Sequence, residues 1–83
     1  MLKNKNLSID TITMALTKVE NANKIELSSL KGYVEQQPAQ AIMNFQALSE
    51  AESIDDKLKK IMNEMPHLRG DAHHVLEAAI LLQ

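Results

Sequence analysis

The stretch SIDTITMALTKVENANKIELSSLKGYV (residues 8–34) carries its apolar side chains at the spacing of an α-helix. Seven steps over 25 positions match the helical repeat of about 3.6 residues and not the alternation by two of a strand. Ser8 has the side chain of an N-cap, so we predict one helix over residues 8–36. Asn23 is the polar member of the stripe, and it either fixes the register of a packed seam or lies where the seam or the helix ends. The stripe runs through Ile9, Ile12, Leu16, Val19, Asn23, Leu27, Leu30 and Val34.

A second stripe follows a short turn at Gln36-Gln37-Pro38. Pro38 suits the first position of a helix, where its missing N–H costs nothing. Ser53 and Asp56 have the spacing of a capping box and could start a separate helix, but the continuous stripe favours one helix over residues 38–65. A turn this short returns the second helix antiparallel to the first. The second stripe comprises Met43, Ala47, Ala51, Ile54, Leu58, Ile61 and Met65.

The segment HLRGDAHH (residues 67–74) is interpreted as a connector. Pro66 ends the second helix, and Gly70 permits a left-handed or tight turn. Asp71 then serves as the N-cap of a helix over residues 71–82. The sequence therefore predicts an all-α fold, in which an antiparallel helical hairpin and a short C-terminal helix form a small three-helix bundle. We expect residues 1–83 to be a single helical domain, because a chain this short supports one core.

Composition excludes several classes of function. The chain has 83 residues, no cysteine and a net charge of −2, so thiolate chemistry and the basic patch of a nucleic-acid-binding protein are both absent from it. No glycine-rich phosphate loop or catalytic constellation is present, and we expect neither a cofactor nor enzymatic activity. The start MLKNKNLSID lacks the apolar run of a secretory signal, and no run of about 18 apolar residues could span a membrane. We expect a cytoplasmic protein, with export by a route without a cleaved signal left open.

Histidines around the connector are the candidates for a metal site. His73 and Glu77 lie four residues apart on one face of the predicted C-terminal helix, and His67 could reach across the turn. These side chains are of the types that zinc accepts. A zinc site also needs a constrained spacing and supporting hydrogen bonds to its ligands, and the spacing here is loose. We therefore predict no metal.

Apolar residues outside the two stripes predict a contact surface. The last segment, VLEAAILLQ (residues 75–83), is apolar on nearly every side, so one neighbouring helix cannot cover it. On the first helix some apolar side chains lie about 140–160° away from the stripe, Leu7 among them. We expect a protein-protein interaction module, an adaptor, chaperone or inhibitor, that binds another protein or another copy of itself. The expected partner-binding residues are Met14, Ile25, Leu76, Ile80, Leu81 and Leu82.

The segment KGYVEQQPAQAIMNFQAL (residues 31–48) resembles in shape the turn region of type III secretion needle subunits. Those subunits are similar in length and also form a helical hairpin with a Pro-containing turn and an apolar C-terminal end. The resemblance implies an alternative function, that of a self-assembling structural subunit. Two features depart from the needle pattern: the second proline of the turn is absent, and Pro66 and Gly70 interrupt the C-terminal helix.

Overall fold

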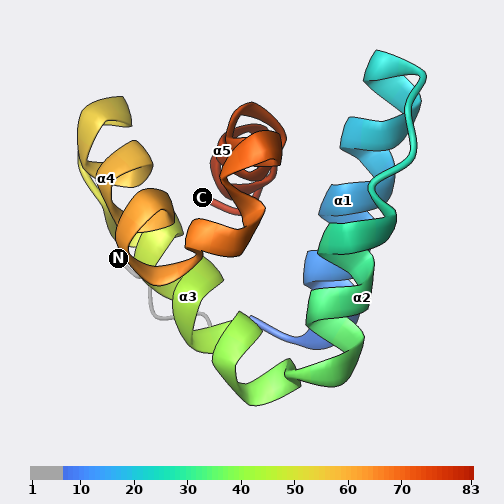
Figure 1. Cartoon of the computed structure of the whole chain (residues 1–83), viewed down its shortest axis with the longest axis horizontal. Coiled ribbons are helices and arrows are strands. Elements are labelled where there is room, and N and C mark those ends of the chain that lie inside the picture. Colours follow the sequence, from blue (N-terminus) through green and yellow to red (C-terminus); the bar gives the residue numbers. More distant parts are fainter. Residues whose placement is uncertain (1–6) are drawn as a thin grey trace.

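The computed structural model describes residues 7–83; residues 1–6, which begin the stretch expected to lack a secretory signal, lie outside the described part. Residues 7–83 form five α-helices and one 3-10 helix, without a β-strand (Figure 1). The all-α prediction is confirmed. The predicted hairpin of two long helices does not form, because each of those helices is interrupted. The elements are α1 (Ile9–Asn23), α2 (Ser28–Gln36), α3 (Pro38–Glu50), α4 (Ile54–Glu64), η1 (Pro66–Asp71) and α5 (Ala72–Leu81).

Helix α5 occupies the centre of the arrangement. It lies between α1 and α2 on one side of the molecule and α4 on the other (Figure 1), and it contacts α1, α3 and α4. Helix α3 contacts each of the other four α-helices. The described chain measures 33 × 24 × 24 Å, and its longest helix, α1, has 15 residues. The long antiparallel hairpin implied by the resemblance to needle subunits is therefore not present in residues 7–83.

Helix α1 ends where the backbone of Lys24 enters the left-handed region, at φ 57° and ψ 48°. The Lys24 N–H still donates to the Glu20 carbonyl oxygen, and the Asn23 side chain donates to the Val19 carbonyl oxygen at 2.9 Å. A left-handed residue turns the chain out of the helix axis and closes the last turn. The continuous helix predicted over residues 8–36 is therefore wrong, and Asn23 marks the end of a helix.

A second interruption separates α3 from α4. Ala51 has extended backbone, and the Ser53 hydroxyl accepts a hydrogen bond from the Asp56 N–H at 3.1 Å. The buried Lys57 ammonium donates to the Ala51 carbonyl oxygen at 2.6 Å, which satisfies a carbonyl left over at the end of α3. The single helix predicted over residues 38–65 is wrong, and the capping-box spacing was the correct signal.

The second predicted stripe coincides with the buried face only in its last part, where Ile61 and Met65 are fully buried and Leu58 packs against the core. Met43 is 63% exposed and Ile54 is 55% exposed. The predicted stripe continues through residues 51–53, where the helix is interrupted. Helices α3 and α4 each turn a separate face to the core. In α3 that face follows the i, i+3, i+4, i+7 pattern of an amphipathic helix and consists of Ala41, Asn44, Phe45 and Leu48.

The connector before α5 is itself helical. Residues Pro66–Asp71 form η1, which buries Leu68. Gly70 has no positive φ, and the Asp71 side chain makes no cap hydrogen bond to α5. Of the two forms predicted at Gly70 the tight turn is present, since Gly70 lies in η1, and the left-handed one is not. The cap predicted at Asp71 is wrong, because η1 leads directly into α5.

Two predicted helix starts are confirmed. The Ser8 hydroxyl accepts a hydrogen bond from the Thr11 N–H at 3.1 Å, and Pro38 lies in the first turn of α3. Both signals act within one helical turn, so they do not depend on the packing of distant elements.

One cluster of buried side chains joins the helices, and it is almost entirely aliphatic. Leu7, expected on a second face of the first helix, belongs to this cluster, and its N–H donates to the Gln46 side-chain oxygen at 3.3 Å. Among residues 7–83 no helix is long and apolar enough to cross a membrane. The largest fully buried side chains are Phe45, Ile12, Leu16, Leu27, Leu30, Leu48, Ile61, Met65, Val19, Val34 and Val75.

Replacing Lys24 by glycine tests the end of α1. Left-handed backbone costs an L-residue about 1–2 kcal/mol, while glycine adds about 0.4–1 kcal/mol of unfolded-state entropy. Lys24→Gly should therefore raise the free energy of unfolding by roughly 0.5–1 kcal/mol, measured by urea denaturation. In a continuous helix the same change would lower the free energy of unfolding by about 1 kcal/mol, so a decrease would contradict the interruption at Lys24.

Gly32→Ala is the control, since an added Cβ at Gly32 in α2 meets nothing within 4 Å. This change should raise the free energy of unfolding by about 1 kcal/mol.

Candidate functional site

The expected partner-binding residues of α5 divide between its surface and its core side. Ile80 and Leu81 are exposed, Leu76 is partly buried against the core, and Leu82 is buried. Leu82 lies one or two turns beyond Ala78 and Val75, on the face that α5 turns inward. The structure therefore leaves two adjacent large apolar side chains of α5 uncovered, fewer than the sequence suggested.

The expected residues of the first helix are separated. Met14 is exposed on α1, on the side opposite the buried Ile12, Leu16 and Val19 face. Ile25 lies in the connection between α1 and α2 and packs partly against the core. Met14 and Ile25 are therefore not two members of one helical face, because the helix ends between them.

Three exposed apolar side chains were missed by sequence reasoning, namely Met43, Ile54 and Met62. Met43 and Ile54 were assigned to the seam of a continuous helix. The Ser53 cap was the signal that could have identified Met43 and Ile54 as exposed. It starts a new helix after α3, so the apolar positions of α3 and α4 do not share one continuous face.

An open pocket of about 220 Å³ lies between α3 and α4. At its floor the Asn44 amide donates to the Tyr33 hydroxyl at 2.7 Å. Burial raises the pKa of Tyr33, and its ring meets that of His67 edge-on at 5.3 Å between ring centroids. Of the residues in these contacts Asn44 lines the pocket, and the hydrogen bond to Tyr33 holds its amide in place. The lining residues are Gln40, Met43, Asn44, Ala47, Leu48, Lys60, Glu64 and Met65.

The candidate metal ligands His67, His73 and Glu77 do not form a ligand set, and within residues 7–83 no three potential ligand side chains gather around one point. Glu77 instead accepts a hydrogen bond from the Asn23 side chain at 2.9 Å, which ties the end of α1 to α5. His74, next in the chain, places its Nδ1 atom 3.9 Å from a carboxylate oxygen of Asp71, beyond hydrogen-bonding distance.

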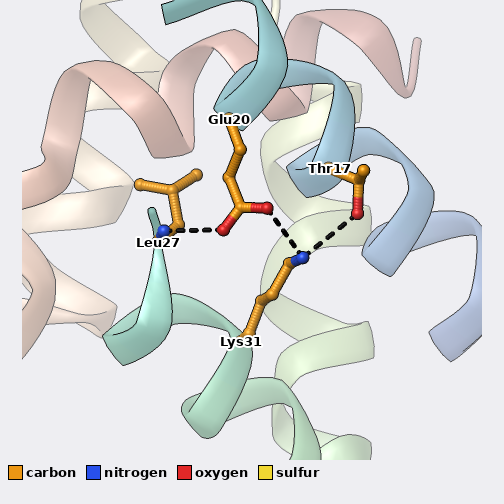
Figure 2. Close-up of polar contacts among 4 residues, drawn as sticks. All are labelled: Thr17, Glu20, Leu27 and Lys31. Atoms are coloured by element: carbon orange, nitrogen blue, oxygen red, sulfur yellow. Dashed lines mark hydrogen bonds and ion pairs between the residues drawn. The ribbon is translucent and has the colours of Figure 1, made fainter. Parts of the chain in front are cut away.

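Glu20 is the centre of a group of polar contacts at the α1–α2 connection. Its carboxylate accepts hydrogen bonds from the Leu27 N–H at 2.7 Å and from the Lys31 ammonium at 2.8 Å. Figure 2 shows the carboxylate between these two donors, with Lys31 also reaching the Thr17 hydroxyl at 3.1 Å. The Leu27 backbone and Lys31 hold the pKa of Glu20 below its ordinary value of 4.5. All of these partners belong to the chain itself, and they join α1 to α2. We call this group of contacts the Glu20 clasp.

Comparison of the chain with protein-family models, with curated proteins and with solved structures gave no match. Function is therefore inferred from the residues and their placement alone.

The Glu20 clasp should make stability depend on pH in the acid range. Because the pKa of Glu20 is lower in the folded chain than its ordinary value of 4.5, the clasp stabilises fully above that value and is lost as the pH falls through the folded-state pKa. Glu20→Gln should lower the free energy of unfolding at pH 7, with a difference from the natural chain that shrinks toward pH 3. Thermal melts across this range measure the difference.

Glu26→Gln is the matched control, because it removes the same charge from an exposed position in the same connection. A loss at pH 7 that is equal in the two variants would contradict a specific role of Glu20.

Proposed function

We propose that the protein is a non-enzymatic protein-protein interaction module, an adaptor, chaperone or inhibitor, that binds its partner through α5. The contact is the α5 surface, defined as Leu76, Ile80 and Leu81. The observation that carries the proposal is the exposure of Ile80 and Leu81, at 44% and 53%, on a helix whose other faces lie in the core. Because each of these side chains is already about half buried, its complete burial by a partner would contribute about 0.7–1.5 kcal/mol.

The position of α5 supports this proposal. The helix contacts α1, α3 and α4, and Glu77 is bonded to Asn23 at the end of α1. The exposed side chains therefore project from a helix that packs against three others, so the backbone that carries them is ordered before a partner binds. Leu82 is buried behind the α5 surface. Met14 and Ile25, on and beside α1, remain proposed contact residues separate from that surface.

The pocket and the polar groups favour binding over catalysis. The α3–α4 pocket, at about 220 Å³, is smaller than the roughly 300–1,000 Å³ of typical small-molecule sites. A second hollow of about 440 Å³ is a more open depression, lined by α4 residues alone. The Glu20 carboxylate, whose pKa is lowered, is engaged by two donors within the chain. These features match a helical scaffold that presents side chains to another protein.

Changing Leu81 to lysine tests the proposal. Leu81→Lys should alter the free energy of unfolding by no more than about 0.5 kcal/mol, since the residue is exposed, and it should abolish binding of the partner. Ile61→Lys, which places a charge in a fully buried position, should cost at least about 3 kcal/mol. His73→Lys is the matched control, because it adds the same charge at an exposed position of α5.

The measurement pairs urea denaturation with quantitative affinity purification on the immobilised natural chain and on the variants Leu81→Lys and His73→Lys. The proposal predicts proteins that bind the natural chain and His73→Lys equally and are lost from Leu81→Lys. If Leu81→Lys destabilises the chain as severely as Ile61→Lys, or keeps every bound protein, the α5 surface is not the contact.

A further inference from the structure

A second exposed surface combines a protruding side chain with a hollow that could receive one. Met43 is 63% exposed at the rim of the α3–α4 pocket. The pocket, at about 220 Å³, is too small for a typical small-molecule ligand. Ala47 is a partly exposed apolar wall of the pocket, and the fully buried Leu48 and Met65 lie beneath it, so the hollow suits one large aliphatic side chain. Methionine is unbranched and adapts to irregular gaps. Met43 and the pocket together are called the α3–α4 patch.

The charged residues of the α3–α4 patch in one copy of the chain are complementary to those of the same patch in a second copy. Lys60 and Glu64 line the pocket from α4, are four residues apart and are both exposed. Within residues 7–83 the ion pair between unlike charged side chains joins Glu20 to Lys31, and neither Lys60 nor Glu64 has an ion-pair partner in this part of the chain. A two-fold axis through the patch would set two copies of α4 antiparallel and place Lys60 of each copy opposite Glu64 of the other.

We infer that the α3–α4 patch binds a second copy of this chain in an isologous dimer. Met43 of each copy enters the pocket of the other, and two Lys60–Glu64 pairs flank the contact and set its orientation. One positive and one negative charge on each copy leave the patch without net charge, so two copies approach without like-charge repulsion. This inference does not rest on the proposed function, which uses the α5 surface.

The floor of the pocket is rigid enough for this role. Asn44 is buried and its amide is fixed by the hydrogen bond to the Tyr33 hydroxyl. Leu48 and Met65 are fully buried beside it. The pocket is therefore formed in the monomer and does not have to open before Met43 can enter. The patch is small against the roughly 800 Å² per partner of a standard interface, so the dimer is expected to be weak and dependent on concentration.

Sedimentation equilibrium of the full chain, from micromolar to millimolar concentration, tests the inference. The natural chain should pass from monomer to dimer, and Met43→Ser should weaken the dimer about 10-fold or more. Met62→Ser is the matched control, because Met62 is 46% exposed on α4 and lies about 160° around that helix from Lys60 and Glu64, and it should leave the dimer unchanged. Circular dichroism of each variant confirms that the fold is kept.

A charge exchange makes the test specific to this geometry. Lys60→Glu should weaken the dimer, and the double variant Lys60→Glu with Glu64→Lys should restore it, because exchanging both charges preserves each pair across a two-fold axis. Ala47→Met, which fills the pocket from inside the same copy, should abolish the dimer and keep the fold.

Three results would overturn the inference: a monomer at every concentration, equal effects of Met43→Ser and Met62→Ser, or no recovery in the charge exchange. A dimer lost in Leu81→Lys and kept in Met43→Ser would also overturn it, and would place self-association on the α5 surface, leaving the proposed function intact.

Discussion

The reversal of the chain between α1 and α2 is the constraint on which the other contacts depend. The left-handed backbone of Lys24 ends α1, and the Glu20 carboxylate holds the first residues of α2 through the Leu27 N–H and Lys31. As a result α2 lies beside α1 (Figure 1). Pro38 then directs α3 across the bundle, so that Asn44 meets the Tyr33 hydroxyl. Were α1 and α2 one straight helix, Tyr33 could not reach the same core as Ile12.

Short helices with an aliphatic core explain why apolar side chains remain outside. A chain of this length buries a limited fraction of its surface, and Phe45 is the one aromatic ring in the fully buried group. Each helix contributes a single narrow face, so apolar residues just beyond its edge, such as Ile80 on α5 or Met43 on α3, stay uncovered. The two surfaces to which we assign binding are thus a direct result of how little each helix can bury.

Local signals in the sequence were more reliable than the long stripes. Ser8, Pro38 and the Ser53–Asp56 spacing each mark a helix start that the structure contains, because a cap acts within one turn of backbone. The stripes failed at the interruptions. A lysine gives no warning of left-handed backbone, which glycine or asparagine usually supplies, and Asn23 beside it was the one visible indication.

The candidate surfaces, like the helices, were predictable only where local sequence determines them. Exposure of Ile80 and Leu81 followed from the apolar character of α5, which exceeds what its neighbours can cover. Leu82 was predicted to bind a partner, whereas it is buried in the core. The sequence does not show how many helices pack against α5. Met43 was missed because the phase of α3 was set by a stripe that continued past Ser53. The pocket arises from the packing of α3 on α4, a tertiary contact that no local pattern specifies.

Backbone chemical shifts and nuclear Overhauser effects in solution test the five-helix fold most directly. The account predicts helical Cα shifts in each of the five α-helices, with non-helical shifts and a positive φ at Lys24 and non-helical shifts at residues 51–53. It also predicts a contact between the side chains of Asn23 and Glu77, which are 2.9 Å apart. Uninterrupted helical shifts through residues 8–36 and 38–65, without that contact, would contradict the fold and both surfaces built on it.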